Sequence, residues 1–330
     1  MTSPDGNGHG ELPIEVLDPE PFPAHLPPPQ PPRPPLFSLV LAAALFCATL
    51  MTTLAVGAQF AAAFARNQAV SLDDYARDLV ALFTAPRLLL PGLDFAVTLM
   101  AILLAHELGH WFACRHHRIR ATLPFFIPAP TLIGTLGAFI LIRSPIRSRR
   151  ALFDVGFSGP LVGFILAIPA LIVGILHSKV VPGLAAGSGP LFGTPLLVSF
   201  LVPILRPGIS PHELLLHPIA RAAWVGLLAT ALNLLPAGQL DGGHILRAAS
   251  ARWHRRITLA LPFLLLPLGF FLWHGWLLWS VLLAVIAFRR TPPLYDWRPL
   301  GHSRLAWAAV ALLIFLLCFM PMPVHEAALH

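Results

Sequence analysis

From residue 36 onward, the chain alternates between long apolar runs and short polar or proline-rich stretches. A helix needs about 20 apolar residues to cross the hydrocarbon core of a bilayer. This pattern predicts an all-α polytopic membrane protein with about seven transmembrane helices, six or eight being the alternatives. The runs are Leu36 to about Phe64, Leu93–Cys114, Phe153–His177, Ile219–Leu235, Ile257–Trp273, Gly275–Phe288 and Leu305–Met320.

Two further apolar stretches, Leu196–Leu205 and Ala121–Ile142, contain prolines or glycines and are not expected to cross the membrane. The longer one has prolines at 124, 128 and 130 and glycines at 134 and 137, which forbid a long regular helix. We predict that it enters the membrane as a re-entrant loop and ends in an extended strand near Thr131–Ile142. Because exposed backbone polar groups are costly in lipid, this segment must pack against the helices or line a wet cavity.

The composition excludes a water-soluble enzyme. Hydrophobic residues make up 56% of the chain and charged residues 11%, whereas soluble domains have roughly 45–50% and roughly 25%. The net charge of +7 comes from short arginine clusters between the apolar runs, which is typical of membrane loops. No basic stripe is interleaved with aromatic residues, so nucleic acid is not an expected partner.

Four arginine groups adjoin ends of the predicted spans. Since positive charge near span ends favours the cytoplasm, we place all four groups and the N-terminus inside. Arg221 conflicts with this scheme, because it falls at the outer end of the fourth span. The groups are Arg115, Arg118 and Arg120; Arg143, Arg147, Arg149 and Arg150; Arg252, Arg255 and Arg256; and Arg289 and Arg290.

Residues 1–35 differ in composition from the rest of the chain. They contain 12 of the 35 prolines, five acidic residues and one basic residue. This composition predicts a disordered Pro-rich tail. The tail lacks the positively charged region that begins a cleavable signal peptide, so we expect the first apolar run to remain as a span.

The second predicted span ends in the pattern His-Glu-x-x-His, at His106, Glu107 and His110. Two histidines four residues apart lie on the same face of a helix and can bind one metal ion. Glu107 is one residue further along, close enough to act on a water molecule without being a ligand. Ionisable groups at membrane depth cost roughly 2 to 3 kcal/mol each, which favours a functional cluster over histidines that merely sit at the interface.

A catalytic zinc site needs a third protein ligand and an open position. The best candidate is Asp241, in the stretch 233–243 at the inner end of the fourth predicted span. Pro236 breaks the helix there, and the glycines at 238, 242 and 243 allow the chain to bend so that the carboxylate points back among the helices. Taken alone, this stretch reads as an interfacial turn; the nearby His-Glu-x-x-His pattern favours the ligand role.

Together these motifs resemble the site-2 protease family of intramembrane zinc metalloproteases. Where the family often has Ala-Gly-Pro, this chain has Ser-Gly-Pro, a small-for-small change that should still permit close helix packing. The resemblance covers about 93 to 245 and rests on His106-Glu107-Leu108-Gly109-His110, Phe157-Ser158-Gly159-Pro160, Asn233-Leu234-Leu235-Pro236 and Leu240-Asp241-Gly242-Gly243.

This resemblance implies a role for each motif residue. His106, His110 and Asp241 would bind one Zn2+ per chain. Glu107 would be the catalytic base, and Asn233 would position substrate or stabilise the oxyanion.

The resemblance is closest to a compact branch of the family, similar to plastid-type members. The stretch 178–218 is too short and too apolar for the PDZ domain of many bacterial members, and 123–128 and 134–138 match a plastid-type Leu-Pro-x-Phe-Ile-Pro and Gly-x-x-Gly-Ala pair. We therefore divide the chain into a Pro-rich tail at 1–35, the first span and an external loop at 36–92, a zinc protease core at 93–245 that includes the re-entrant segment 121–142, and C-terminal spans at 246–330.

An unpaired strand edge in the re-entrant segment is predicted to bind an unwound substrate as an added strand. Thr135 and Leu136 lie on this strand. The alternative is an ordinary re-entrant packing element, and the clamp interpretation depends partly on the family resemblance.

Other titratable residues near the motifs have simpler interpretations. Cys114 is expected to be a small buried hydrophobe, and His116 and His117 to join the interfacial basic cluster. Asp154 is expected to cap a helix or form an ion pair. His244 is a candidate neighbour of the site.

We therefore predict an intramembrane zinc metalloendopeptidase that cleaves transmembrane helices of membrane proteins in regulated intramembrane proteolysis. The alternative is a zinc-binding transporter or a catalytically silent scaffold. Transport predicts polar residues over several spans, yet these spans are nearly bare of them. One lysine against 21 arginines indicates a GC-rich bacterial genome, and hence a bacterial inner membrane. The arginine groups at the span ends place the active-site face in the cytoplasm. The sequence does not indicate an oligomeric state.

Overall fold

The computed structural model describes residues 36–68, 84, 86–181, 190–288, 294 and 298–326. All of them belong to one compact unit that extends from 34 to 330. The predicted tail and most of the predicted external loop between 66 and 87 lie outside the described residues.

A helix coincides with each predicted span. Three stretches, Leu36–Arg66, Arg87–His116 and Arg149–Leu176, are long and apolar enough to cross a membrane. The structure thus supports an integral membrane protein. Helices α9 (Gly275–Ala287) and α10 (His302–Cys318) have only 13 and 17 residues, so the number of crossings stays a prediction. The helices are α1 (Leu36–Arg66), α3 (Leu93–His116, following the 3-10 helix η1, Pro86–Gly92), α4 (Arg149–Leu176), α6 (Pro218–Asn233), α8 (Ala251–Phe271), α9 (Gly275–Ala287) and α10 (His302–Cys318).

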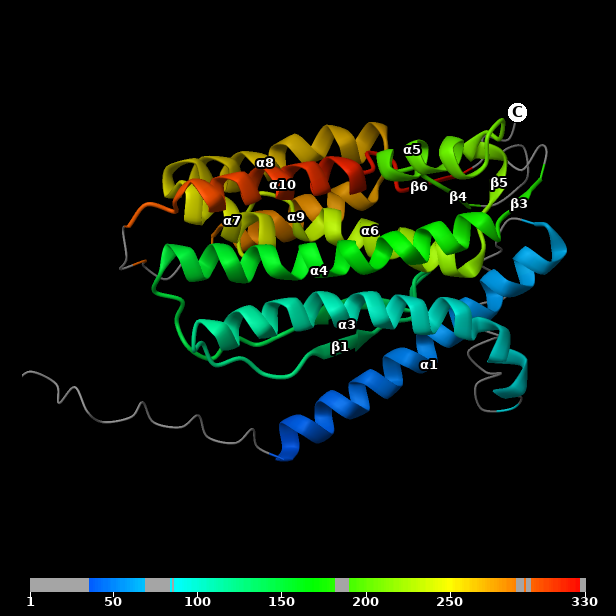
Figure 1. Ribbon diagram of the computed structural model, residues 1–330, viewed down its shortest axis with the longest axis horizontal. Helices are drawn as coiled ribbons and strands as arrows, with labels where there is room; N and C mark the ends of the chain where they lie inside the picture. Colours follow the sequence, from blue (N-terminus) through cyan, green and yellow to red (C-terminus); the bar gives the residue numbers. More distant parts are fainter. Residues whose placement is uncertain are drawn as a thin grey trace, which may run out of the picture. The chain divides into compact units, whose positions relative to one another are not determined.

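Helices α3 and α4 lie side by side and antiparallel (Figure 1). On its other side α4 packs against α6 and the short helix α7 (Asp241–Ala249). Leu171, Ile175 and Leu227 are completely buried in this core. Helices α8 and α9 form a tight hairpin, with the rings of Trp273 and Trp276 5.5 Å apart at its corner.

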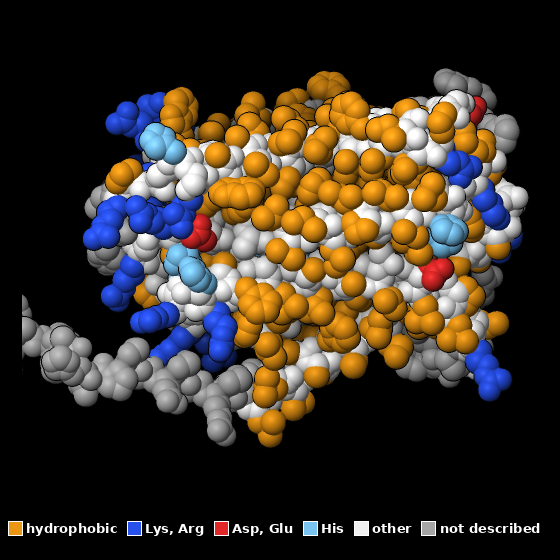
Figure 2. All heavy atoms as spheres, in the orientation of Figure 1, with side chains coloured by type: hydrophobic (Ala, Val, Ile, Leu, Met, Phe, Trp, Pro, Cys, Tyr) orange, Lys and Arg blue, Asp and Glu red, His pale blue; other side chains and the backbone are white. Residues whose placement is uncertain are grey.

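Hydrophobic side chains cover the middle of the face in Figure 2, and charged side chains gather at its two ends. Large exposed hydrophobic residues include Ile165 and Val173 on α4 and Phe263 and Phe270 on α8. Soluble proteins rarely expose apolar surfaces of this extent. A bilayer around these helices accounts for the surface.

The segment 121–142 is an antiparallel hairpin of two strands, β1 (Phe125–Pro128) and β2 (Thr135–Phe139). The second strand lies inside the predicted extended stretch. The first strand was not predicted, because Pro124 before it and Pro128 at its end obscure any strand pattern in so short a run. In the observed register, Phe125 pairs with Phe139 and Phe126 with Ala138.

The hairpin packs against α1. Phe126 is buried, and its ring meets the ring of Phe46 edge-on at 5.1 Å. Thr52 donates a hydrogen bond of 2.6 Å from Oγ1 to the carbonyl oxygen of Gly134 in the turn. Non-helical backbone at membrane depth requires such protein partners, and α1 supplies them.

Short elements occupy the described part of the stretch 178–218 and the end of the chain. Helix α5 has ten residues, about 15 Å of helix, which is too short to cross a bilayer. Strand β3 pairs with β5, and β4 pairs with β6. The elements are β3 (Lys179–Val180), β4 (Pro190–Phe192), α5 (Leu196–Leu205), η3 (Pro211–Glu213), β5 (Leu214–Leu215) and β6 (Val324–Glu326).

Arg221, which conflicts with the distribution of the other arginines, is a buried residue at the beginning of α6. Its guanidinium lies 5.0 Å from the ring centroid of Phe60 and 4.9 Å from that of Phe192. Its Nε donates a hydrogen bond of 3.2 Å to the carbonyl oxygen of Leu216. Arg221 therefore has a packing role that a rule about charges in loops does not anticipate.

Candidate metal centre

His106 and His110 lie on one face of α3, one turn apart, as the sequence predicts. Their ring centroids are 4.8 Å apart, and the residues are 5% and 7% exposed. Nδ1 of His110 lies 2.7 Å from the carbonyl oxygen of Val155 on α4 and donates to it. With its proton on Nδ1, His110 presents Nε2 to the site in the form that binds a metal.

Asp241 completes the cluster. Its Oδ2 lies 3.2 Å from Nε2 of His106 and 3.4 Å from Nε2 of His110, and one ligand atom from each residue lies within 4.8 Å of the others. Burial acts to raise the pKa of Asp241, but the two imidazoles outweigh it and hold that pKa well below its ordinary value. Two imidazole nitrogens and one carboxylate oxygen are a donor set of catalytic zinc sites, so these residues fit zinc.

A sharp turn between α6 and α7 brings Asp241 to α3. Gly238 has a φ of 58°, a left-handed conformation that glycine adopts at little steric cost. Gly243 packs directly on the same turn, where a β-carbon would lie 2.5 Å from the carbonyl oxygen of Ala237. The glycines at 238 and 243 are therefore needed for the bend that the sequence predicts.

Two buried residues of α8 hold this turn in place. Thr258 accepts a hydrogen bond of 3.0 Å at Oγ1 from the backbone N–H of Gly238. Nε2 of His254 lies 2.9 Å from the carbonyl oxygen of the same glycine. The sequence analysis did not identify these two residues. The feature that could have indicated them is a pair of polar residues four positions apart at the start of an apolar helix.

Helix α4 makes room for both histidines by presenting glycines to them. A β-carbon on Gly163 would lie 3.1 Å from Cβ of His106, and one on Gly159 would collide with Nε2 of His110. On α3, a β-carbon on Gly109 would lie 2.6 Å from the carbonyl oxygen of Ser158. The Ser-Gly-Pro motif thus permits close packing at the metal centre.

Replacing Gly159 by Ala should displace the imidazole of His110 and weaken zinc binding by about 10-fold or more, the effect typical of losing a group that orients a ligand. Zinc retained after dialysis against a competing chelator measures this loss. Ser158→Ala is the matched control, because among the described residues its hydroxyl donates to the Val155 carbonyl of its own helix, at 3.2 Å. Equal zinc retention in the two variants would contradict the packing argument.

Glu107 and Asn233 lie beside the cluster. Glu107 is 5% exposed, and its carboxylate lies near the backbone of Ile140, the residue after β2. Nδ2 of Asn233, the last residue of α6, lies 3.3 Å from Nε2 of His106. The structure therefore brings the predicted site residues of α3, α6 and α7 together.

A cavity of about 730 Å³ opens next to the cluster and extends along α3 and α6. Residues of β2 line it together with His106, Glu107 and Asn233. Thr135 and Leu136 are among them. The remaining lining is mainly apolar and includes Phe60, Ile102, Leu103, Trp224, Val225 and Leu228.

The other titratable candidates lie outside the cluster. Asp154 forms the expected ion pair, with Arg304 at 2.7 Å and His117 at 2.8 Å, and α4 begins well before it, which excludes the capping role. Cys114 is buried. Burial lowers the pKa of His244 to about 4, and its Nδ1 is buried without a hydrogen-bond partner among the described residues.

Comparison with known proteins adds a family match. The profile described as Peptidase family M50 matches residues 94–262. "Probable zinc metalloprotease EGY1, chloroplastic" of Oryza sativa subsp. japonica is 35% identical over 190 residues, 52% of this chain and 33% of that protein. The Arabidopsis thaliana protein of the same name is 29% identical over 306 residues, 87% of this chain and 54% of the relative. The chain thus spans about a third to a half of the length of these relatives.

Proposed function

The chain belongs to peptidase family M50, and from this premise we propose that it is an intramembrane zinc metalloendopeptidase acting on membrane-spanning helices of other proteins. The observation that carries the proposal is the buried cluster of His106, His110 and Asp241, with Glu107 beside it at the wall of a cavity. The name of the plant relatives, "Probable zinc metalloprotease", supports it.

In this proposal, His106, His110 and Asp241 bind one zinc ion. Zinc, when bound, supplies a Lewis acid that promotes deprotonation of water and stabilises negative charge on a carbonyl oxygen. Glu107 accepts the proton of the attacking water and returns it to the leaving amine. Asn233 hydrogen-bonds the substrate carbonyl; its position 3.3 Å from Nε2 of His106 supports this role.

The substrate we propose is the spanning helix of a membrane protein. The cavity beside Glu107 is lined mainly by apolar residues, which suits an apolar segment and disfavours a soluble polar peptide. A helix hides its peptide bonds, so the substrate must be unwound where it meets the zinc centre.

Strand β2 is the element that we propose holds the unwound segment. Leu141 and Arg143 direct backbone hydrogen bonds toward the preceding part of the hairpin, and partners alternate along an antiparallel strand. Ala138 and Ile140 therefore direct their backbone groups to the other edge, and the backbone of Ile140 lies near Glu107. Among the described residues this sheet has two strands, so an added strand would find that edge open next to the catalytic carboxylate.

Ala138→Pro should abolish cleavage while zinc content stays normal, because proline removes a backbone donor from the open edge. Ala138 is a better test position than Leu136, whose backbone N–H faces Ile127 of β1 in the observed register, or Thr135, whose hydroxyl donates a bond of 2.9 Å to Ile127 within the hairpin. Ala138→Ser, which keeps the N–H, is the matched control and should retain most activity. Normal cleavage by the proline variant would show that this edge does not hold substrate.

Neither alternative function is favoured. A transport path needs polar groups along several helices, whereas the cavity next to the zinc cluster is mainly apolar. A silent scaffold has no need of Glu107, which lies buried beside the cluster.

We also propose seven crossings, with the N-terminus and the active-site face in the cytoplasm of a bacterium whose inner membrane holds the protein. The arginine clusters at one end of the spans support this orientation. The ratio of arginine to lysine supports the bacterial assignment. Cysteine labelling of intact cells at Arg147 and at Ser210, which lie at opposite ends of the helices, tests the orientation.

The proposed activity is tested by metal analysis of the purified full chain and by cleavage of a reporter protein with one transmembrane helix. We expect about one zinc per chain and cleavage within or next to that helix. Loss of cleavage on chelation and recovery on adding zinc would complete the test. A zinc-loaded chain that cleaves none of a panel of such reporters would favour the scaffold alternative.

A further inference from the structure

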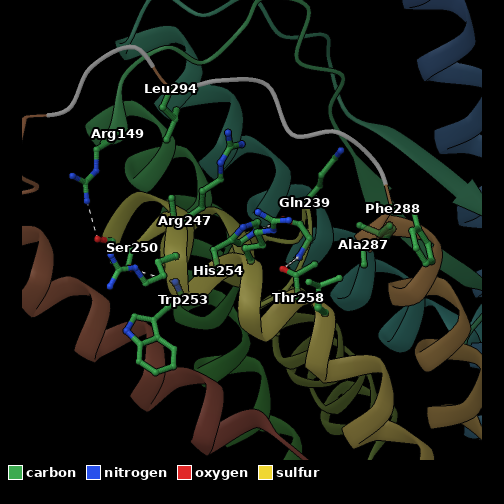
Figure 3. A pocket seen from close by; sticks show the side chains of 17 residues that line it. Arg149, Gln239, Arg247, Ser250, Trp253, His254, Thr258, Ala287, Phe288 and Leu294 are labelled. Carbon is green, nitrogen blue, oxygen red and sulfur yellow. Dashed lines mark hydrogen bonds between the residues drawn. The ribbon is translucent and has the colours of Figure 1, made fainter.

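A second cavity of about 970 Å³ lies among the end of α7, the beginning of α8 and the end of α9. It shares no lining residue with the cavity at the zinc cluster. Figure 3 shows Arg149 and Ser250 on one side of it and Ala287 and Phe288 on the other. The mechanism above makes no use of this cavity.

The polar part of the cavity is strongly basic. Arg149, Arg247, Arg252 and Arg255 line it, and no described lining residue carries a carboxylate. Arg149 is held in place by hydrogen bonds of 2.8 Å from Nε and Nη2 to the carbonyl oxygens that end α7. Four guanidinium groups around one hollow favour an anion, and guanidinium matches the geometry of phosphate.

Helix α8 adds to this preference through its N-terminus. The helix has 21 residues and begins at Ala251, which lines the cavity. The positive end of the helix dipole therefore adjoins the arginines. Arg252 and Arg255 are three residues apart, on neighbouring positions of the helix surface, and both are exposed.

The rest of the cavity is apolar and open. Trp253 is 55% exposed, Leu259 47% and Phe288 86%, and all three line the cavity. The apolar run of α8 begins at Ile257, so the cavity lies where a helix enters the membrane. An inorganic anion would leave these apolar side chains uncovered, whereas a lipid would cover them with its glycerol backbone and acyl chains.

From this combination we propose that the cavity binds the phosphate headgroup of an anionic phospholipid. The arginines contact the phosphate, and Trp253, Leu259 and Phe288 contact the apolar part of the lipid. Basic pockets between membrane helices are typical sites for such headgroups. The cavity wall also includes Gly238 and Gln239, so a bound lipid would contact the turn that leads to Asp241.

Fluorescence quenching of Trp253 tests the proposal in the full chain reconstituted into phosphatidylcholine vesicles. Brominated phosphatidylglycerol or brominated phosphatidylcholine is added at equal mole fraction, and the signal of Trp253 is isolated by subtracting that of Trp253→Phe. We expect phosphatidylglycerol to be preferred, by roughly 5-fold for each contacting arginine. Equal quenching of the unmodified protein by the two lipids would overturn the proposal.

Charge variants distinguish this cavity from general attraction to a basic membrane face. Arg252→Gln with Arg255→Gln should remove most of the preference for phosphatidylglycerol. The matched control is Arg147→Gln with Arg150→Gln, which removes the same charge from exposed residues that do not line the cavity, and it should keep the preference. Equal losses in the two double variants would show diffuse attraction and contradict a site.

Inorganic phosphate serves as the competitor that distinguishes a lipid from a soluble anion. Millimolar phosphate, compared with chloride at the same ionic strength, should leave the quenching by phosphatidylglycerol unchanged. Displacement by phosphate but not by chloride would assign the cavity to a soluble phosphate compound, and the lipid proposal would then be wrong.

Discussion

Glu107→Gln should keep zinc at about one ion per chain and reduce the cleavage rate by about 100- to 10,000-fold, the range contributed by a general base. The substitution removes no ligand, because the cluster consists of His106, His110 and Asp241. Glutamine has nearly the same shape and keeps an acceptor oxygen at the same position. It cannot accept the proton of water, so the chemical step fails while the site stays assembled.

The matched control for this experiment is Glu213→Gln, the same chemical change at an exposed residue of η3. It should retain both zinc and cleavage. Cleavage that survives in the Glu107 variant would refute the proposed base, and loss of zinc in that variant would show that Glu107 helps to hold the metal.

Asp241→Ala should lose both zinc and cleavage, because it removes one of three ligands. The expected loss of zinc affinity exceeds the 10- to 100-fold typical of groups that only orient a ligand. The change also leaves His106 and His110 without the carboxylate that lies 3.2 and 3.4 Å from them. Zinc content after dialysis against a competing chelator, measured together with reporter cleavage, gives both quantities.

Asp94→Ala is the control for the loss of an aspartate, since the side chain of Asp94 is 57% exposed and far along α3 from the cluster. It should behave as the unmodified protein. Full zinc occupancy in the Asp241 variant would exclude Asp241 as a ligand and direct attention to Cys114 or His244.

The re-entrant segment shows where sequence patterns lose information. Prolines and glycines correctly exclude a regular helix over 121–142, and the second strand lies within the expected stretch. The sequence pattern did not predict the first strand, because a four-residue strand with proline at its end is too short to show a strand periodicity. Its position depends on Phe46 and Thr52 of α1, which are distant in the chain.

The sequence by itself determined those features that depend on local geometry. The four-residue spacing of His106 and His110 places both imidazoles on one helix face wherever that helix lies, and apolar runs of sufficient length become helices in a bilayer because no other partner satisfies their backbone. The glycines around Asp241 predicted a bend in the chain. These properties need no knowledge of neighbouring elements.

Only the tertiary structure decided which groups complete the site. The carbonyl of Val155 sets the protonated nitrogen of His110, Gly159 leaves space for its ring, and His254 and Thr258 hold the turn before Asp241. Each contact joins residues on different elements, so its existence depends on how α3, α4, α7 and α8 pack. The basic cavity arises in the same way, from arginines on α4, α7 and α8, because charges that are separate in the chain form a site only when packing brings them together.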